Sequence, residues 1–232
     1  MHAFYLPDLS AKLVLDAEES AHAVKVLRKR EGDTLLLTDG KGRLAEARIT
    51  KAHTRGCELE LSGPISQIEK RPYSIHIAIS PTKNLDRMEW MVEKCTELGI
   101  DKISFLLCEN SERKVLKADR LLKKAISAMK QSGNLYLPEL NELVSFHDFV
   151  KTGSREDQKM IAYVDESHPH ELKRILKPNG SYCILIGPEG DFSQEEIQMA
   201  ITGGFLPVSL GSSRLRTETA GIAACHTCHL IN

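Results

Sequence analysis

The sequence predicts two domains, a small β-rich domain at the amino end followed by a larger α/β domain. Short runs with alternating apolar residues dominate the first part of the chain, as in strands with one solvated face. From residue 73 onward, short apolar runs alternate with stretches of helical spacing, which is typical of a mostly parallel sheet covered on both faces. We therefore expect domains over residues 1–70 and 73–232, with a linker at 62–72.

The first domain should open with a helix, because Asp16 can cap it and a glutamate follows three positions later. This helix should run through Val24 and Leu27 and end before Gly32. Short antiparallel strands and a single helix favour a β-barrel-like module. The strand-like runs lie at 34–39, 45–49 and 57–61, and the first two are joined by the tight-turn sequence Asp39-Gly40-Lys41-Gly42.

The second domain alternates strands and helices throughout. Ser193 and Glu196 form a capping-box pattern, so a helix should begin there and end at Gly203-Gly204. The other expected strands are 75–79, 103–107, 159–165 and 182–186, the other expected helices are 85–98, 119–131 and 171–176, and a final helix should open within 216–219.

Composition limits the possible partners. Of the 232 residues, 41% are hydrophobic and 27% are charged, as in ordinary globular proteins, and the formal net charge is −1. A nucleic acid would therefore have to be held by a local basic patch rather than by overall charge. The chain contains neither a secretory leader pattern nor an apolar run long enough for a membrane span, so we expect a cytoplasmic protein without a membrane partner.

Two strands of the second domain end in polar loops that contain glycine. The run 182–186 ends in Gly187-Pro188-Glu189-Gly190, and the run 207–210 ends in the segment from Gly211 to Gly221. Ligands of open α/β sheets bind beyond the carboxyl ends of the strands, and glycines let a ligand lie directly on the backbone. No lysine follows the glycines, so a nucleoside triphosphate is disfavoured and a small adenosine-like molecule is favoured. Ordinary strand-to-helix connections would give the same pattern.

Several motifs resemble one known family, the ribosomal small-subunit RNA (uracil-N3) methyltransferases of the knotted SPOUT class. The motifs occur in the expected order over nearly the whole chain: HAVKVLR at 22–28, KNLDRMEWMVEKCTELGI at 83–100, KQSGNLYLPEL at 130–140, IGPEGDF at 186–192 and SLGSSRLRTETA at 209–220. The resemblance implies a PUA-like RNA-binding barrel at 1–70 and a trefoil-knotted methyltransferase domain at 73–232. It also implies a homodimer that uses S-adenosyl-L-methionine and acts on 16S rRNA, with no DNA partner.

The resemblance carries cofactor contacts onto specific positions: Ile186, Gly187, Glu189, Gly190, Leu210, Gly211, Leu215, Arg216 and Thr219. Two positions depart from the family pattern. Asp191 stands where glycine is usual, which adds a carboxylate near the expected sulfonium. Asn134 stands where arginine is usual, so a contact of that arginine with RNA or a dimer partner would be replaced here.

The expected reaction requires that uracil N3 lose its proton before it can accept a methyl group. A carboxylate could accept this proton, and a cation could stabilise charge on the uracil oxygens. Glu218 and Arg216 are the candidates for these roles, and a helix-start ion pair between them is an equally good interpretation. Alternative functions are methylation of another RNA, or RNA binding and ribosome assembly without catalysis.

A basic run in the first domain could bind RNA phosphates. No acidic residue interrupts it, although a solvated helix end would look the same. Its members are His22, Lys25, Arg28, Lys29 and Arg30. Near the carboxyl end, Cys225-His226-Thr227-Cys228-His229 matches a haem or metal pattern. We expect neither group there, because cysteines three apart on one face of a helix usually pack.

Overall fold

The computed structural model describes residues 3–10, 12–163 and 170–232, and these divide into two compact units. The first unit comprises residues 1–70 together with 126–137, and the second comprises 71–125 together with 138–232. Residues 126–137, which we expected in the second domain, therefore group with the first. They include the last turns of helix α3 (Ala118–Ser132), whose sequence periodicity does not reveal which core it supports.

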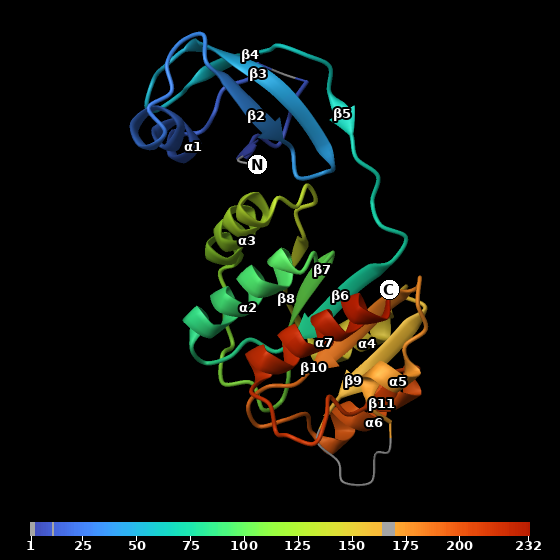
Figure 1. Ribbon diagram of the computed structural model, residues 1–232. Helices are drawn as coiled ribbons and strands as arrows, with labels where there is room; N and C mark the ends of the chain where they lie inside the picture. The colour runs from blue at the N-terminus through green and yellow to red at the C-terminus, as the bar shows by residue number, and fades with distance from the viewer. Residues whose placement is uncertain (1–2, 11, 164–169) are drawn as a thin grey trace. The chain divides into compact units, whose positions relative to one another are not determined.

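The first unit contains a five-stranded sheet that packs over one apolar core (Figure 1). Strand β2 (Thr34–Thr38) pairs antiparallel with β3 (Arg43–Lys51), and β3 pairs antiparallel with β4 (Glu58–Leu61). The sequence did not predict the two short additions, β1 (Ala3–Tyr5), which runs parallel to β2, and β5 (Ser66–Gln67), which pairs with β3.

The expected helix begins at its predicted cap but changes its winding. Asp16 accepts a hydrogen bond from the Glu19 amide at 2.8 Å, which starts α1 (Ala17–Ala21). The chain then continues as a π-helix, His22–Val26, and ends at Leu27. The wider turn contains most of the HAVKVLR motif, and π-turns are frequent at functional sites.

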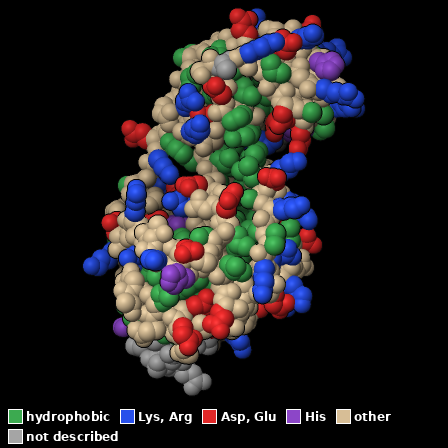
Figure 2. Space-filling model, turned by 180° about the vertical axis from the view of Figure 1, so that it is seen from behind, with side chains coloured by type: hydrophobic (Ala, Val, Ile, Leu, Met, Phe, Trp, Pro, Cys, Tyr) green, Lys and Arg blue, Asp and Glu red, His purple; other side chains and the backbone are tan. Residues whose placement is uncertain are grey.

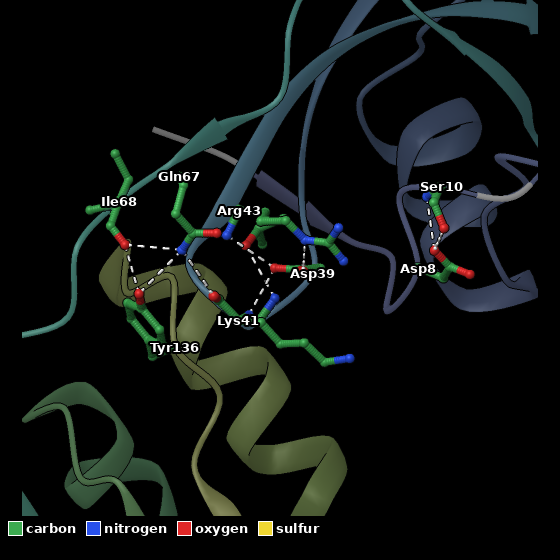
Figure 3. Close-up of polar contacts among 10 residues, drawn as sticks. Asp8, Ser10, Asp39, Lys41, Arg43, Gln67, Ile68 and Tyr136 are labelled. Carbon is green, nitrogen blue, oxygen red and sulfur yellow. Dashed lines mark hydrogen bonds and ion pairs between the residues drawn. The ribbon is translucent and has the colours of Figure 1, made fainter.

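The turn between β2 and β3 packs against residues 135–137 of the same unit (Figure 3). Asp39 is buried and accepts hydrogen bonds from the Lys41 amide (2.8 Å) and from Arg43 Nε (2.6 Å). A Cβ on Gly42 would lie 2.3 Å from the Tyr136 hydroxyl, and φ at this position is +85°. Glycine is therefore required at residue 42, both for the close approach and for the backbone conformation.

The second unit contains a six-stranded parallel sheet in the order β11-β9-β10-β6-β7-β8 (Figure 1). The strands are β6 (Ser74–Ile79), β7 (Lys102–Leu107), β8 (Glu139–Ser145), β9 (Gln158–Ala162), β10 (Ser181–Ile186) and β11 (Leu206–Val208). The expected strand 159–165 corresponds to β9, and its residues 164 and 165 lie outside the described residues. The sequence did not predict β8, whose half-buried residues do not alternate cleanly.

Helices cover both faces of this sheet. The helices α2 (Leu85–Glu97) and α7 (Thr217–Ile231) pack on one face, where Gly221 approaches Ile79 and Met91 closely. The helices α4 (Phe146–Thr152) and α6 (Gln194–Thr202) pack on the other face over an apolar cluster that includes Ala78, Leu106 and Leu185. A shorter helix, α5 (Leu172–Ile175), precedes β10.

Charged side chains do not gather by sign on the face shown in Figure 2, where basic and acidic groups are interspersed. This agrees with the net charge of −1. Among the described residues, no helix combines the length and apolar character needed to cross a bilayer.

Candidate active site

The two glycine loops lie beyond the carboxyl ends of β10 and β11, and one buried hydrogen bond joins the first loop to the start of α7. Thr217 Oγ1 donates to the Gly187 carbonyl at 3.1 Å, and the Thr217 residue is 6% exposed. Thr217 is the first residue of α7, so this bond fixes the helix start against the end of β10. The structure thus brings together the two segments that the sequence predicted as one site.

The loop after β10 is held by neighbouring segments as well. Glu189 Oε1 accepts the Lys83 amide at 3.1 Å, and Asn110 Nδ2 donates to the Asp191 carbonyl at 3.1 Å. A Cβ on Gly190 would lie 3.2 Å from the Asn110 Cβ, so the 110 loop packs directly on the glycine. Sequence reasoning missed Asn110, although it lies in the loop that follows the apolar strand β7 (Lys102–Leu107).

Asp191 occupies a left-handed backbone position, with φ of +62°. Glycine adopts this conformation freely, whereas aspartate is one of the few other residues that tolerate it. The Asp191 carboxylate also accepts a hydrogen bond from the next amide, that of Phe192, at 2.8 Å. The departure from the family pattern is therefore accommodated locally, because the side chain closes the turn that glycine would otherwise permit.

The second loop is shaped by its own hydrogen bonds. Ser209 Oγ accepts the Gly211 amide at 3.1 Å and donates to the Gly211 carbonyl at 2.9 Å. Gly211 has φ of +129° and its Cα faces open space, so a ligand can approach the main chain there. Leu210, Leu215 and Thr219 are half-buried.

Glu218 is 5% exposed and faces a cation, but that cation is not Arg216. The Arg87 Nε atom of α2 lies 3.7 Å from Glu218 Oε1, while Arg216 caps α7 and is exposed. Within the described residues, Glu218 Oε2 is buried and has no hydrogen-bond partner. Buried polar atoms are nearly always satisfied, so an orphaned carboxylate oxygen beside two ligand loops indicates that a ligand or substrate group completes it.

These features fit S-adenosyl-L-methionine. The exposed backbone around Gly190 and Gly211 offers main-chain groups, and Leu210 and Leu215 offer apolar surface. Sequence reasoning missed Thr217 and Arg87. Arg87 lies in a motif that carried the resemblance, but nothing in the sequence assigned it a role.

Only three of the five residues of the basic run in the first unit line the same hollow. This hollow of about 590 Å³ is lined by three residues of the run and by three others: Arg28, Lys29, Arg30, Glu31, Val24 and Ala52. Lys25 is exposed nearby in sequence, whereas His22 is half-buried and packs its ring on Phe4 at 5.6 Å. Asn134 lies in the segment 126–137 that groups with this unit.

The cysteines of the C-x-x-C-H pattern are packing residues in this fold. Cys225 and Cys228 are fully buried, and burial raises the pKa of the Cys228 thiol. The His229 ring nitrogen Nδ1 is hydrogen-bonded to the Tyr73 hydroxyl, so it already has a protein partner.

Comparison with known proteins identifies the family of both units. The family of RNA methyltransferase domains matches residues 69–229, and the family of RNA methyltransferase PUA domains matches residues 15–62. These two matches cover both units, so the protein is of the RNA methyltransferase class.

Individual relatives narrow the class. The ribosomal RNA small subunit methyltransferase E of Mycobacterium bovis is 30% identical over 94% of this chain and 86% of its own length. A crystal structure of a probable rRNA-methyltransferase from Porphyromonas gingivalis has a TM-score of 0.92, is 41% identical and covers 100% of this chain and 98% of its own. The structure of the ribosomal RNA small subunit methyltransferase E of Neisseria gonorrhoeae, solved with bound S-adenosyl methionine, has a TM-score of 0.87 and is 29% identical. The match covers 100% of this chain and 98% of the Neisseria chain.

The chain belongs to the ribosomal RNA small subunit methyltransferase E family. The fold class expected from the resemblance is confirmed in its two parts, an α/β methyltransferase domain with a parallel sheet covered by helices and a PUA-like domain before it.

Proposed function

We propose that this protein uses S-adenosyl-L-methionine to methylate N3 of a uridine in 16S rRNA of the small ribosomal subunit. The observation that carries the proposal is the pair of glycine loops, joined by the Thr217–Gly187 hydrogen bond, in a member of this family. The cofactor supplies an electrophilic methyl group when bound. The protein must hold the base in line with that group and remove the N3 proton, which are tasks of positioning and base catalysis.

Glu218 is the group best placed to accept the N3 proton. Its Oε2 atom has no hydrogen-bond partner among the described residues, while the Arg87 guanidinium near Oε1 keeps a cation beside the carboxylate. Arg216, the exposed N-cap residue of α7, does not take part in that ion pair. Its proposed role is to stabilise the negative charge that develops on the uracil oxygens. The proposed cofactor contacts are those carried over from the resemblance.

Labelled-methyl transfer to small ribosomal subunits, followed by mapping of the modified base, tests the activity. We expect one methylated uridine, and loss of about 100-fold or more in rate for Glu218→Gln with cofactor affinity retained. Glu195→Gln, an exposed substitution of the same kind on α6, serves as the control. A Glu218→Gln protein that transfers at the normal rate removes Glu218 from the mechanism.

The same experiment separates the alternative functions. Transfer to another RNA, with none to 16S rRNA, would assign the same chemistry to a different substrate. Failure to bind S-adenosyl-L-methionine in calorimetry would favour a non-catalytic RNA-binding or assembly factor. The intact loop hydrogen bonds, and the local accommodation of Asp191, favour the enzyme.

The hollow beside Arg28, Lys29 and Arg30 is proposed to contact RNA phosphates, together with His22 and Lys25. Reversal of Lys25, Arg28 and Lys29 to glutamate should weaken rRNA binding and flatten its dependence on salt, since each lost phosphate contact lowers the salt slope by about one. Lys12→Glu with Arg48→Glu, exposed positions of the same unit outside the hollow, is the control. Equal effects of the two sets would refute a localised RNA surface.

A homodimer working in the cytoplasm, where ribosomal subunits are found, completes the proposal. Trp90 on α2 is 46% exposed, and large exposed aromatic residues are enriched at protein interfaces. Sedimentation should give a dimer that Trp90→Glu converts to monomer. Leu206→Glu, equally exposed on β11, should leave the dimer intact. A monomeric wild-type protein would refute the dimer.

A further inference from the structure

The second unit contains a polar cavity of about 490 Å³ that lies away from the glycine loops. The glycine loops follow the carboxyl ends of β10 and β11, whereas the polar groups of the cavity sit in the amino-terminal halves of β6, β7 and β8 and just before β9. Its wall includes His76, Lys102, Ser104, Asn141, Phe149 and Glu156. None of these residues belongs to the site proposed above.

Three of these side chains form a continuous hydrogen-bonded relay. His76 Nδ1 lies 2.8 Å from Glu156 Oε1, and His76 Nε2 lies 2.8 Å from Ser104 Oγ. His76 is 5% exposed and Ser104 is 1% exposed, so both bonds are shielded from bulk water. Sheet register creates this neighbourhood, because Ser104 on β7 is paired with Ala78, two residues beyond His76 on β6.

The surrounding groups fix the direction of the protons. Although burial raises it, hydrogen bonds from His76 and Ser154 lower the pKa of Glu156 to about 2. In a neutral imidazole that donates its Nδ1 hydrogen to an ionised Glu156, Nε2 is an acceptor. Asn141 Nδ2 donates to Ser104 Oγ at 2.8 Å, so the Ser104 hydroxyl points its own hydrogen toward His76.

The imidazole is also held sterically. The Phe149 ring packs edge-on against His76 with centroids 5.7 Å apart, and Ser154 donates a hydrogen bond to the second oxygen of Glu156. The base of the relay and the group that orients it are therefore both fixed in place. A nucleophile bonded to a base that is itself oriented by a carboxylate is the arrangement that activates serine in acyl-transfer enzymes.

We propose that Ser104, His76 and Glu156 form a second catalytic site, which transfers an acyl group from small uncharged carboxylic esters to Ser104 and then to water. The ester must be small, because Ser104 is 1% exposed and lines a cavity of about 490 Å³. It should be uncharged, because the wall carries both signs, with Lys102 and Arg155 opposed by Glu142, Asp148 and Glu156.

The reaction balances with water as the only co-reactant. Ser104 Oγ bonds to the acyl carbon as its proton moves to His76 Nε2, and the bond from the acyl carbon to the ester oxygen breaks. His76 returns that proton to the departing alkoxide. Water then attacks the acyl carbon, His76 takes the water proton, and Oγ recovers a proton as the acid leaves. The Asn141 amide, beside Oγ, can donate to the oxygen on which charge develops.

A metal site is the competing interpretation of the same residues. One ligand atom each from His76, Glu156 and Cys183 lies within 4.8 Å of the others. However, both nitrogens of His76 already have protein partners, and burial raises the pKa of the Cys183 thiol to about 12. The relay therefore accounts for more of the observed contacts than a metal ion would.

The test is acetylation of the full chain by p-nitrophenyl acetate after treatment with a chelator. We expect a burst of nitrophenolate and an acetyl group localised to Ser104 by mass spectrometry. His76→Gln should slow the burst by about 100-fold or more, and Glu156→Gln by at least about tenfold. Ser20→Ala, a fully buried serine bonded to the Leu15 carbonyl and the Cys57 amide, should leave labelling of Ser104 unchanged.

Calorimetry with S-adenosyl-L-methionine, whose proposed site lies at the opposite ends of the strands, checks that each variant is folded. Folded wild-type protein that gives no Ser104 adduct overturns the proposal, as does an adduct whose rate is unaffected by His76→Gln. Binding of one Zn²⁺ per chain that depends on Cys183, without acetylation of Ser104, would also overturn it in favour of a metal site.

Discussion

Replacing Thr217 by valine should weaken cofactor binding without unfolding the protein. Valine has nearly the same shape as threonine but cannot donate to the Gly187 carbonyl, so one buried hydrogen bond of 3.1 Å is lost. Leaving a buried carbonyl without its donor costs about 1–3 kcal/mol. Because the bond joins the two loops of the site, its loss should disturb their arrangement, and most of the free-energy cost should appear as weaker cofactor binding. A loss of about 1–2 kcal/mol corresponds to about 5- to 30-fold weaker binding.

Isothermal calorimetry with S-adenosyl-L-methionine measures the effect, with thermal unfolding followed in parallel. Thr227→Val is the matched control, because Thr227 lies on the same helix but its hydroxyl bonds to the Ala223 carbonyl within that helix at 2.8 Å. Thr227→Val should bind the cofactor as the wild type does. An unchanged dissociation constant for folded Thr217→Val, or equal weakening by both substitutions, would refute the argument that this bond builds the site.

Three further predictions concern stability. Gly42→Ala should lower the free energy of unfolding in urea by about 2–4 kcal/mol, because the new Cβ would clash with the Tyr136 hydroxyl at a position with positive φ. Gly63→Ala is the control, since Gly63 has open space around it, and it should change the free energy of unfolding by less than about 0.5 kcal/mol. Similar values for the two variants would contradict the proposed clash at residue 42. Asp191→Gly should be nearly neutral, since relief of the left-handed conformation offsets loss of the hydrogen bond to the next amide; a loss of more than about 2 kcal/mol would be inconsistent. Glu156 has a folded-state pKa of about 2, below its usual 4.5, so its stabilisation should be complete above pH 4.5 and disappear as the pH falls to 2. That contribution is at most about 3 kcal/mol, and a Glu156→Gln protein whose stability falls as steeply as the wild type over this range would argue against it.

Local signals in the sequence predicted most of the second unit. The capping box at Ser193 is present with both of its hydrogen bonds, and α2 ends one residue before the predicted position, at Glu97. These predictions succeeded because caps, glycines and helical spacing act over a few residues. The strand β8 escaped detection because it lies at the sheet edge and most of its residues are half-buried, so its pattern does not alternate.

The site was predicted less completely than the fold. Main-chain loops such as Gly187–Gly190 can be recognised from glycines after a strand, but their partners come from distant segments. Arg87 approaches Glu218 only through the packing of α2 beside α7, and Asn110 reaches the loop only through strand order. No rule of spacing predicts such contacts. A knot was expected only from the resemblance, because general topology rules disfavour threaded chains.

The discontinuous first unit has a consequence for the order of events during synthesis. Strand β3 and its turn are made early, but the Gly42 amide donates to the Leu135 carbonyl, and the Tyr136 hydroxyl donates to the Ile68 carbonyl at 2.6 Å. These contacts cannot form until residue 137 or so has left the ribosome, well after translation of the first seventy residues. The growing chain must therefore carry an unfinished barrel while the first strands of the methyltransferase domain are already emerging.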